Sequence, residues 1–190
     1  MDLRGTRRRM SKRGLAAPLA ALVVSTLVAL RPGMVYGAVG DHFTYSGANG
    51  DKFEVDIIDG REHFIHNFAN GNKLEGDVQS GTGHAKLTFA NGDEIESDVK
   101  DNKPNGHEII TFANGDKCER NVKDGKHNGH ESWTFANGDS CECNVKDGKL
   151  NGHFIYAYAN GDKEEGDYKD GRRDGNVIRT HATGNKLLRI

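Results

Sequence analysis

The sequence predicts an all-β protein, an elongated single-layer antiparallel β-meander of stacked hairpins. Glycine supplies 25 of the 190 residues, and many of these glycines recur at regular intervals. The triplet Ala-Asn-Gly begins at Ala48, Ala69, Ala90, Ala113, Ala136 and Ala159, and a degenerate copy, Ala182-Thr183-Gly184, follows. The first two intervals are equal, the later four are equal and longer by one dipeptide, and such regular spacing is typical of a tandem repeat.

A second turn signal divides each repeat into two strands. It lies between successive triplets, at Asp59-Gly60, Ser80-Gly81, Asp101-Asn102, Asp124-Gly125, Asp147-Gly148 and Asp170-Gly171. The runs between turn signals are about six to eight residues long, which suits strands and is too short for helices. Each repeat is therefore predicted to form one β-hairpin.

The loop geometry at the triplet decides which side chains share a face. A two-residue turn at Asn114-Gly115 would place Phe112 and Cys118 on opposite faces. A three-residue loop, with Gly115 in the left-handed conformation, pairs Ile110 with Cys118 and collects all apolar residues on one face. We favour this register, because a one-residue slip would expose one strand's entire apolar set to water.

In this register the apolar residues form columns that run across the repeats, and the opposite face is polar. The columns include Phe68, Phe89, Phe112, Phe135 and Tyr158 beside the triplets, Leu87, Ile110, Trp133 and Tyr156 next to them, and Val78, Val99, Val122 and Val145 near the second turn. One apolar and one solvated face are typical of antiparallel meanders.

Residues 1–37 have the pattern of a secretory signal peptide. Six basic residues precede an apolar run over residues 15–30, and Val35 and Gly37 suit a cleavage after Gly37. Two alternatives remain open: a twin-arginine export signal around residues 6–12, and an uncleaved signal anchor. In each case residues 38–190 are expected to face an exported compartment, secreted or extracytoplasmic.

The net charge of −2 conceals two parts of opposite sign. Residues 1–37 hold seven of the 26 basic and one of the 28 acidic residues, which leaves 19 basic and 27 acidic residues, a net charge of −8, for residues 38–190. Nucleic-acid binding requires a basic surface, so this charge argues against it. It also argues against simple attraction to an anionic membrane.

The repeats resemble the membrane occupation and recognition nexus (MORN) repeat. Residues 158–171 carry the resemblance: Tyr158, then Gly161-Asp162, Gly166, Tyr168 and a closing Gly171. It covers residues 43–190 as six repeats and a terminal fragment. In two repeats the MORN mid-strand glycine is replaced by Arg120 and Cys143, and its tyrosine is Cys118, Cys141 or Glu164 in three.

The MORN resemblance implies a grooved, single-layer rod that acts as a scaffold, a dimerisation surface or a phospholipid contact. It implies no catalytic domain, and the repeats occupy nearly all of residues 38–190. We therefore expect a non-catalytic protein without a cofactor that binds a protein, a peptide or a second copy of itself. The candidate groove contacts are Phe89, Phe112, Trp133, Phe135, Tyr156 and Tyr158, since rigid aromatic area favours binding hot spots.

Basic residues flank the second turns and form the candidate for the alternative function, peripheral phospholipid binding. They are Lys123, Lys126, Lys146, Lys149, Lys169 and Arg172. Aspartates at the turn tips interleave with them. A solvated edge that discourages strand addition by other chains is the other interpretation.

Histidine and cysteine recur but do not predict a metal site. His84, His107, His130 and His153 occupy one position of successive repeats, which places neighbours about 9 to 10 Å apart, too far to share a zinc ion. They are either solvated residues or a column that responds to pH.

The three cysteines are Cys118, Cys141 and Cys143. Cys118 and Cys141 occupy one column, about 10 Å apart, which is beyond disulfide reach. The thiols are interpreted as small apolar residues, with an intermolecular disulfide and a thiolate metal or redox site as alternatives.

Overall fold

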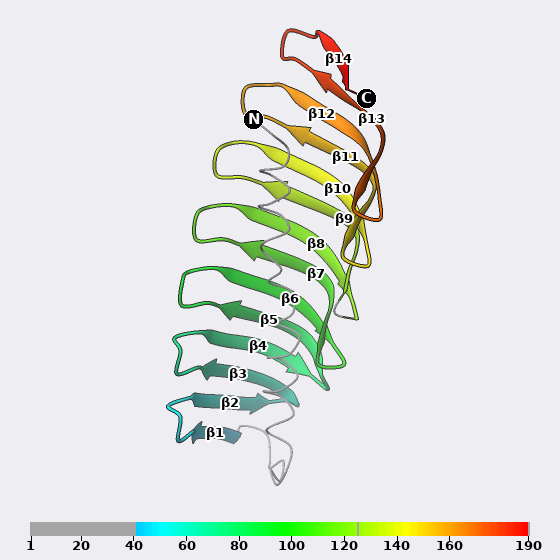
Figure 1. The fold of residues 1–190 in the computed structure, drawn as a ribbon. Coiled ribbons are helices and arrows are strands. Elements are labelled where there is room, and N and C mark those ends of the chain that lie inside the picture. Colours follow the sequence, from blue (N-terminus) through cyan, green and yellow to red (C-terminus); the bar gives the residue numbers. More distant parts are fainter. Residues whose placement is uncertain (1–40, 125, 190) are drawn as a thin grey trace.

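The computed structural model describes residues 41–124 and 126–189; the predicted signal segment, residues 1–37, lies outside them. The described residues form one antiparallel sheet of 14 strands whose spatial order follows the sequence (Figure 1). This confirms the predicted single-layer β-meander. The strands are β1 (Asp41–Ser46), β2 (Lys52–Ile58), β3 (Arg61–Asn67), β4 (Lys73–Gln79), β5 (Thr82–Thr88), β6 (Glu94–Lys100), β7 (Lys103–Thr111), β8 (Lys117–Lys123), β9 (Lys126–Thr134), β10 (Ser140–Lys146), β11 (Lys149–Ala157), β12 (Lys163–Lys169), β13 (Arg172–Thr180) and β14 (Lys186–Arg189).

The Ala-Asn-Gly loops have the predicted three-residue geometry. The backbone N–H of Phe112 donates to the carbonyl of Asp116 at 2.8 Å, and Ile110 pairs with Cys118. Gly115 has a φ of 87°, in the region where a side chain is strained. The preferred register is therefore confirmed. These loops all lie along one long edge of the sheet, on the left in Figure 1, which we call the loop edge.

The residue after each triplet links neighbouring repeats. The Oδ1 atom of Asp116 accepts a hydrogen bond from the backbone N–H of Ala136 in the next loop, at 3.0 Å. The same bond joins Asp51 to Ala69, Asn72 to Ala90, Asp93 to Ala113, Asp139 to Ala159 and Asp162 to Ala182. This loop ladder satisfies a backbone donor in each repeat, which explains why Asp or Asn always follows the glycine.

The second turns contain two residues with positive φ. Asp59 and Gly60 have φ values of 51° and 73°, and Ile58 pairs with Arg61 across them. This is the geometry of a type I′ turn, whose twist matches that of the flanking strands and which favours Asp-Gly. We call this second edge, on the right in Figure 1, the turn edge.

The longer period of the later repeats comes from an inserted bulge. In β7, Asn105, Gly106 and His107 lie opposite the single residue Asp98, because Ser97 pairs with Glu108 but Val99 pairs with Pro104. Equivalent register shifts follow in the three later repeats. The inserted Asn-Gly or Asp-Gly pair thus lengthens β7, β9, β11 and β13 to nine residues without moving either turn.

One face of the sheet is buried and the other is polar, as the register predicts. In β10, for example, Cys141, Cys143 and Val145 are buried and the residues between them are exposed. Two rows of cross-strand partners on the buried face matter below. The loop-side row begins at Tyr45 and runs through Phe53, His66, Leu74, Leu87, Ile95, Ile110, Cys118, Trp133, Cys141, Tyr156, Glu164 and Arg179 to Leu187. The middle row runs through Phe64, Gly76, Ala85, Ser97, Glu108, Arg120, Glu131, Cys143, Phe154 and Gly166.

Candidate functional site

Five of the six predicted groove residues form a continuous aromatic row along the loop edge. The rings of Phe112 and Trp133 stack with centroids 6.1 Å apart, and those of Trp133 and Phe135 with centroids 6.0 Å apart. Phe135 contacts Tyr156 at 5.9 Å, and Tyr156 meets Tyr158 edge-on at 4.7 Å. The sixth residue, Phe89, packs against the core one repeat earlier.

Most of this aromatic surface faces other side chains of the same chain. Phe112, Trp133, Phe135 and Tyr156 are only 3% to 5% exposed, whereas Phe89 and Tyr158 are half-buried. Partner binding by the row stays a prediction. Among the six predicted groove residues, the accessible aromatic area lies mainly at Phe89, outside the row, and at Tyr158, at its end.

The polar atoms of the buried aromatic residues have partners. Trp133 Nε1 donates to Glu131 Oε2 at 3.3 Å, and the Tyr156 hydroxyl donates to Asp139 Oδ2 at 2.7 Å. Asp139 belongs to the loop ladder, so the aromatic row and the ladder hold each other in place. These bonds satisfy groups whose burial would otherwise be costly.

At its C-terminal end the aromatic row meets a charged cluster that the sequence analysis missed. The Arg179 guanidinium lies 5.1 Å from the centroid of the Tyr158 ring and donates to Asp162 at 2.8 Å and to Glu164 at 3.4 Å. His181 Nδ1 lies 3.3 Å from Asp162 Oδ2. The available sequence signal was a pair of charged residues, Glu164 and Arg179, at successive positions of a column that is apolar elsewhere except at His66.

The electrostatics of this cluster follow from its contacts. Hydrogen bonds from Arg179 and from the Ala182 backbone lower the pKa of Asp162 to about 2. Burial raises the pKa of Tyr158. Glu164 Oε2 and Arg179 Nε are buried without a hydrogen-bond partner among the described residues. Two carboxylates against one guanidinium leave an excess of negative charge beside the Tyr158 ring.

A second charged group, in the middle row, is fully internal. Arg120 Nε donates to Glu108 Oε1 at 2.7 Å, and Arg120 Nη2 contacts the same oxygen. Glu131 is the cross-strand neighbour of Arg120 on the other side. Burial raises the pKa of both Glu108 and Glu131. His127 lies 3.7 Å from Glu131, and burial together with the charge of Arg120 lowers its pKa to about 4.

The three cysteines lie in the core beside this charged group, unpaired. Burial is the main cause that raises the pKa of Cys118, and a hydrogen bond with Cys141, followed by burial, raises that of Cys143. Both thiols are thus held in the protonated form, which is neither a nucleophile nor a metal ligand. The geometry supports their interpretation as small apolar residues.

The predicted histidine column lies on the polar face and is longer than the four residues named from the sequence. His84 and His153 lie 3.6 and 3.3 Å from Asp98 and Asp167 on the next strand. The same contact at His63 and at His42 extends the column to β1. Over the described ranges, no three His, Cys, Asp or Glu side chains converge to hold a metal ion.

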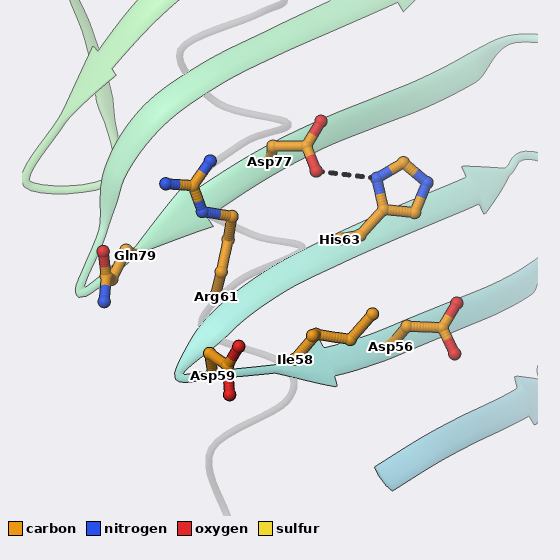
Figure 2. Close-up of a pocket in the computed structure, with 7 residues that line it drawn as sticks. All are labelled: Asp56, Ile58, Asp59, Arg61, His63, Asp77 and Gln79. Atoms are coloured by element: carbon orange, nitrogen blue, oxygen red, sulfur yellow. Dashed lines mark hydrogen bonds and ion pairs between the residues drawn. The ribbon is translucent and has the colours of Figure 1, made fainter. Parts of the chain in front are cut away.

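The polar face carries a shallow depression at the N-terminal end of the turn edge, with a volume of about 460 Å³. Figure 2 shows its lining, in which His63 Nδ1 is bonded to Asp77 Oδ1 at 2.9 Å. It is lined by Asp56, Ile58, Asp59, Arg61, His63, Asp77 and Gln79. These residues are exposed or half-buried.

The predicted basic residues form matched pairs along the turn edge. Lys123 pairs with Lys126 across its turn, as does Lys146 with Lys149 and Lys169 with Arg172. All six side chains are exposed. Lys100 faces Lys103 in the same way, so like charges face each other at four successive turns. Within residues 41–124 and 126–189, no helix is long and apolar enough to cross a membrane.

No protein-family model matches the chain, and no curated protein is similar to it. Among solved structures, the chain is similar to the TCP domain of SAS-4 (dCPAP) of Drosophila melanogaster, determined in complex with a proline-rich motif of Ana2 (dSTIL). The two sequences are 18% identical, and the match covers 84% of this chain and 96% of that chain with a TM-score of 0.45. The chain itself is a repeat-like antiparallel β-meander.

Proposed function

We propose that the chain is a non-catalytic, exported scaffold that binds a protein or peptide partner at the C-terminal end of its aromatic row. The observation that carries this proposal is the half-buried Tyr158 ring, which lies beside Arg179, Asp162 and Glu164. An aromatic ring next to excess negative charge suits a basic side chain, through cation–π attraction and ion pairing. The partner segment is therefore expected to present lysine or arginine.

The repeats are further proposed to be degenerate MORN repeats. The positive-φ glycine of each loop and the loop ladder supply a physical reason for the Gly-Asp pair of the MORN pattern. The replacements at Arg120 and Cys143 are accommodated in the middle row, where both side chains are buried.

A matched pair of variants tests the binding site. Tyr158 and Phe68 occupy the same position in different repeats and both are half-buried, but Phe68 stacks on His66 instead of meeting a charged cluster. We expect Tyr158→Ala to weaken capture of a partner from the exported fraction about tenfold and Phe68→Ala to leave it unchanged.

Site-specific crosslinking locates the contact. A photo-crosslinker at His181, beside the cluster, should capture the partner, and one at His63, on the opposite face, should not. If Tyr158→Ala and Trp133→Ala both bind normally with unchanged β circular dichroism, the aromatic row is not the binding site.

Phospholipid binding at the turn edge is a second candidate, which the four facing pairs of cations favour. Anionic headgroups would relieve the repulsion within each pair. Binding should then weaken with salt. Sedimentation with anionic vesicles that is absent, or that salt and a Lys123→Glu, Lys146→Glu variant leave unchanged, would remove this candidate.

A further inference from the structure

The polar face of the sheet is more uniform from repeat to repeat than the buried face. On every even strand from β2 to β12, one exposed or half-buried position of the polar face is glutamate: Glu54, Glu75, Glu96, Glu119, Glu142 and Glu165. The buried residue directly before each glutamate changes along the chain, in the order Phe53, Leu74, Ile95, Cys118, Cys141 and Glu164. The outward position is therefore constant where the inward position varies.

Histidine is equally constant on the odd strands between these glutamates. Figure 2 shows one such residue, His63 on β3, between Asp56 on β2 and Asp77 on β4. The bulge inserted directly before His107 leaves it paired with Asn121 on the next strand, so the row continues through the longer repeats. The exposed histidines are His63, His84, His107, His130 and His153. We call the row of glutamates and this neighbouring row the Glu–His array.

Neither packing nor duplication explains the uniformity of the array. Substitutions at exposed positions usually change stability little, so the fold tolerates many residues there. Recent duplication of the repeats would have left the buried positions as uniform as the exposed ones. A ligand that contacts each repeat in the same way does explain it. Such a ligand must repeat with the pitch of one hairpin, which is two strand spacings or about 9.6 Å.

Among peptide conformations, the polyproline II helix matches this pitch. It has three residues per turn and repeats every 9.3 Å or so, about 0.3 Å less than one hairpin. Two residues of an extended strand span only about 6.7 Å. Two turns of an α-helix, seven residues, span about 10.5 Å, so a helix would run ahead by about 4 Å over four hairpins. A polyproline II segment lying across the strands therefore presents one residue of every three to each repeat.

The charge of the array selects a basic ligand. Besides its glutamates, the array carries further carboxylates in the histidine row, at Asp56, Asp77, Asp98 and Asp167. Lysines neutralise part of this charge, as Lys117 does at 2.7 Å from Glu119, whereas Asp77 contacts His63 at 2.9 Å. The carboxylates of the array outnumber the lysines that pair with them, so a ligand with regularly spaced cations is complementary to it.

We propose that the Glu–His array binds a peptide segment in the polyproline II conformation with lysine or arginine at every third position. The segment runs along the rod, across the strands, and each hairpin receives one cation beside its glutamate. The half-buried Ile65, Ile109 and Ile155, which lie between glutamates of neighbouring strands, give the intervening residues an apolar contact. This site lies on the face opposite Tyr158 and does not rest on the proposed function above.

Two synthetic peptides of equal composition and length test the match of pitch. One repeats the triplet Lys-Pro-Pro, and the other carries all its lysines in one block followed by the prolines. Fluorescence anisotropy of the labelled peptides measures their binding to the full chain. We expect the periodic peptide to bind at least tenfold more tightly than the block peptide. Equal affinities would show attraction by net charge alone and would overturn the proposal, as would the absence of binding by the periodic peptide.

Two triple variants with the same change in net charge locate the site. Glu96→Gln, Glu119→Gln and Glu142→Gln together should raise the dissociation constant of the periodic peptide about tenfold, as expected for three exposed ion pairs. The control removes three turn-tip carboxylates away from the array, where asparagine tolerates the positive φ, and should bind as the parent does. Its changes are Asp59→Asn, Asp101→Asn and Asp147→Asn. Equal losses in both variants would contradict a site at the array. The comparison of the two peptides needs no variant, so it decides the proposal even if a variant unfolds.

Crosslinking tests the direction in which the peptide lies. Photo-crosslinkers at His84 and at His130, two hairpins apart in the histidine row, should react with positions of the periodic peptide about six residues apart. Random positions would overturn the predicted register. Tyr158→Ala should bind the periodic peptide as the parent does. Loss of binding in that variant would place the peptide at the Tyr158 cluster, which would overturn this proposal and leave the proposed function standing.

Discussion

The N-terminal part of the sheet, residues 41–100, and the C-terminal part, residues 101–180, use the same hairpin to build different interiors. In the N-terminal part the repeats have the shorter period, and the middle row holds Phe64, Gly76, Ala85 and Ser97. In the C-terminal part the repeats have the longer period, and the same row continues with Glu108, Arg120, Glu131 and Cys143.

The inserted bulge occurs where the middle row changes from apolar and small residues to charged ones. It appears first between β6 and β7, at the point where the middle row becomes charged. A bulge bends its strand and increases the local twist, and the later strands curve more strongly near the turn edge in Figure 1. Loop and turn chemistry thus preserve the repeat, while the residues in the middle of the strand vary.

The largest expected change in the free energy of unfolding comes from two deletions in β7, one that removes the bulge and one that shifts the strand register. Deletion of both Asn105 and Gly106 converts the repeat to the shorter period and retains the pairs Val99–Pro104 and Ser97–Glu108, so we expect a loss of about 1–2 kcal/mol. Deletion of Gly106 alone shifts one strand by one residue and turns its apolar set outward. That variant should lose about 5 kcal/mol or more, most of the stability of a small domain. Urea denaturation of both variants measures the difference; similar losses would contradict the proposed role of the bulge.

The next effect concerns the buried charges that only the C-terminal part holds. Arg120→Ala leaves Glu108 and Glu131 without their shared cation, and should cost about 3–5 kcal/mol. Replacement of all three by Leu, Met and Leu removes the charges together and should be neutral or stabilising. Equilibrium unfolding of the two variants checks this. A triple variant less stable than Arg120→Ala would mean that the ion pairs themselves stabilise the fold.

The same charged group predicts a pH dependence. Because the pKa of His127 is about 4 in the fold, below its ordinary value near 6.5, the fold favours neutral histidine and loses stability as the pH falls from about 6.5 toward 4. The loss between pH 7 and pH 5 should be about 2 kcal/mol. Glu108 and Glu131 act in the opposite sense, since their raised pKa values make the fold take up protons before the unfolded chain does.

His127→Gln isolates the histidine contribution. This variant should lose less stability on acidification than the parent, whereas His153→Gln, at an exposed position, should follow the parent. Denaturation midpoints at pH 7 and pH 5 are the measurement. Equal pH slopes in His127→Gln and the parent would show that His127 does not titrate in this way.

The smallest effect tests the feature that both parts share. Asn72→Ala and Asp116→Ala each remove one acceptor of the loop ladder, in the N-terminal and C-terminal part respectively. We expect losses of about 1 kcal/mol for the amide and about 2 kcal/mol for the charged carboxylate. Thermal unfolding compares them with Asn137→Ala, which removes only the two bonds that Asn137 makes within its own loop, to the side chain and to the backbone of Asp139. If the loop ladder does not stabilise the fold, all three variants should lose the same amount of stability.

The regular part of this architecture was predictable from the residues. The triplet period and the second turns located the hairpins, and Gly115 with its neighbours fixed the register that places Ile110 opposite Cys118. The aromatic row followed from that register. The cluster at Tyr158 did not, because Arg179 lies on β13, and only its pairing with β12 brings it to Asp162 and Glu164.

The sequence by itself determined the repeat, its two turns and the face that each side chain takes, because turn conformation and alternation along a strand are local properties. Only the tertiary structure decided the rest: that most of the aromatic row is covered, and that Glu108 and Arg120 are buried as partners. Burial and charge pairing depend on neighbours from other repeats.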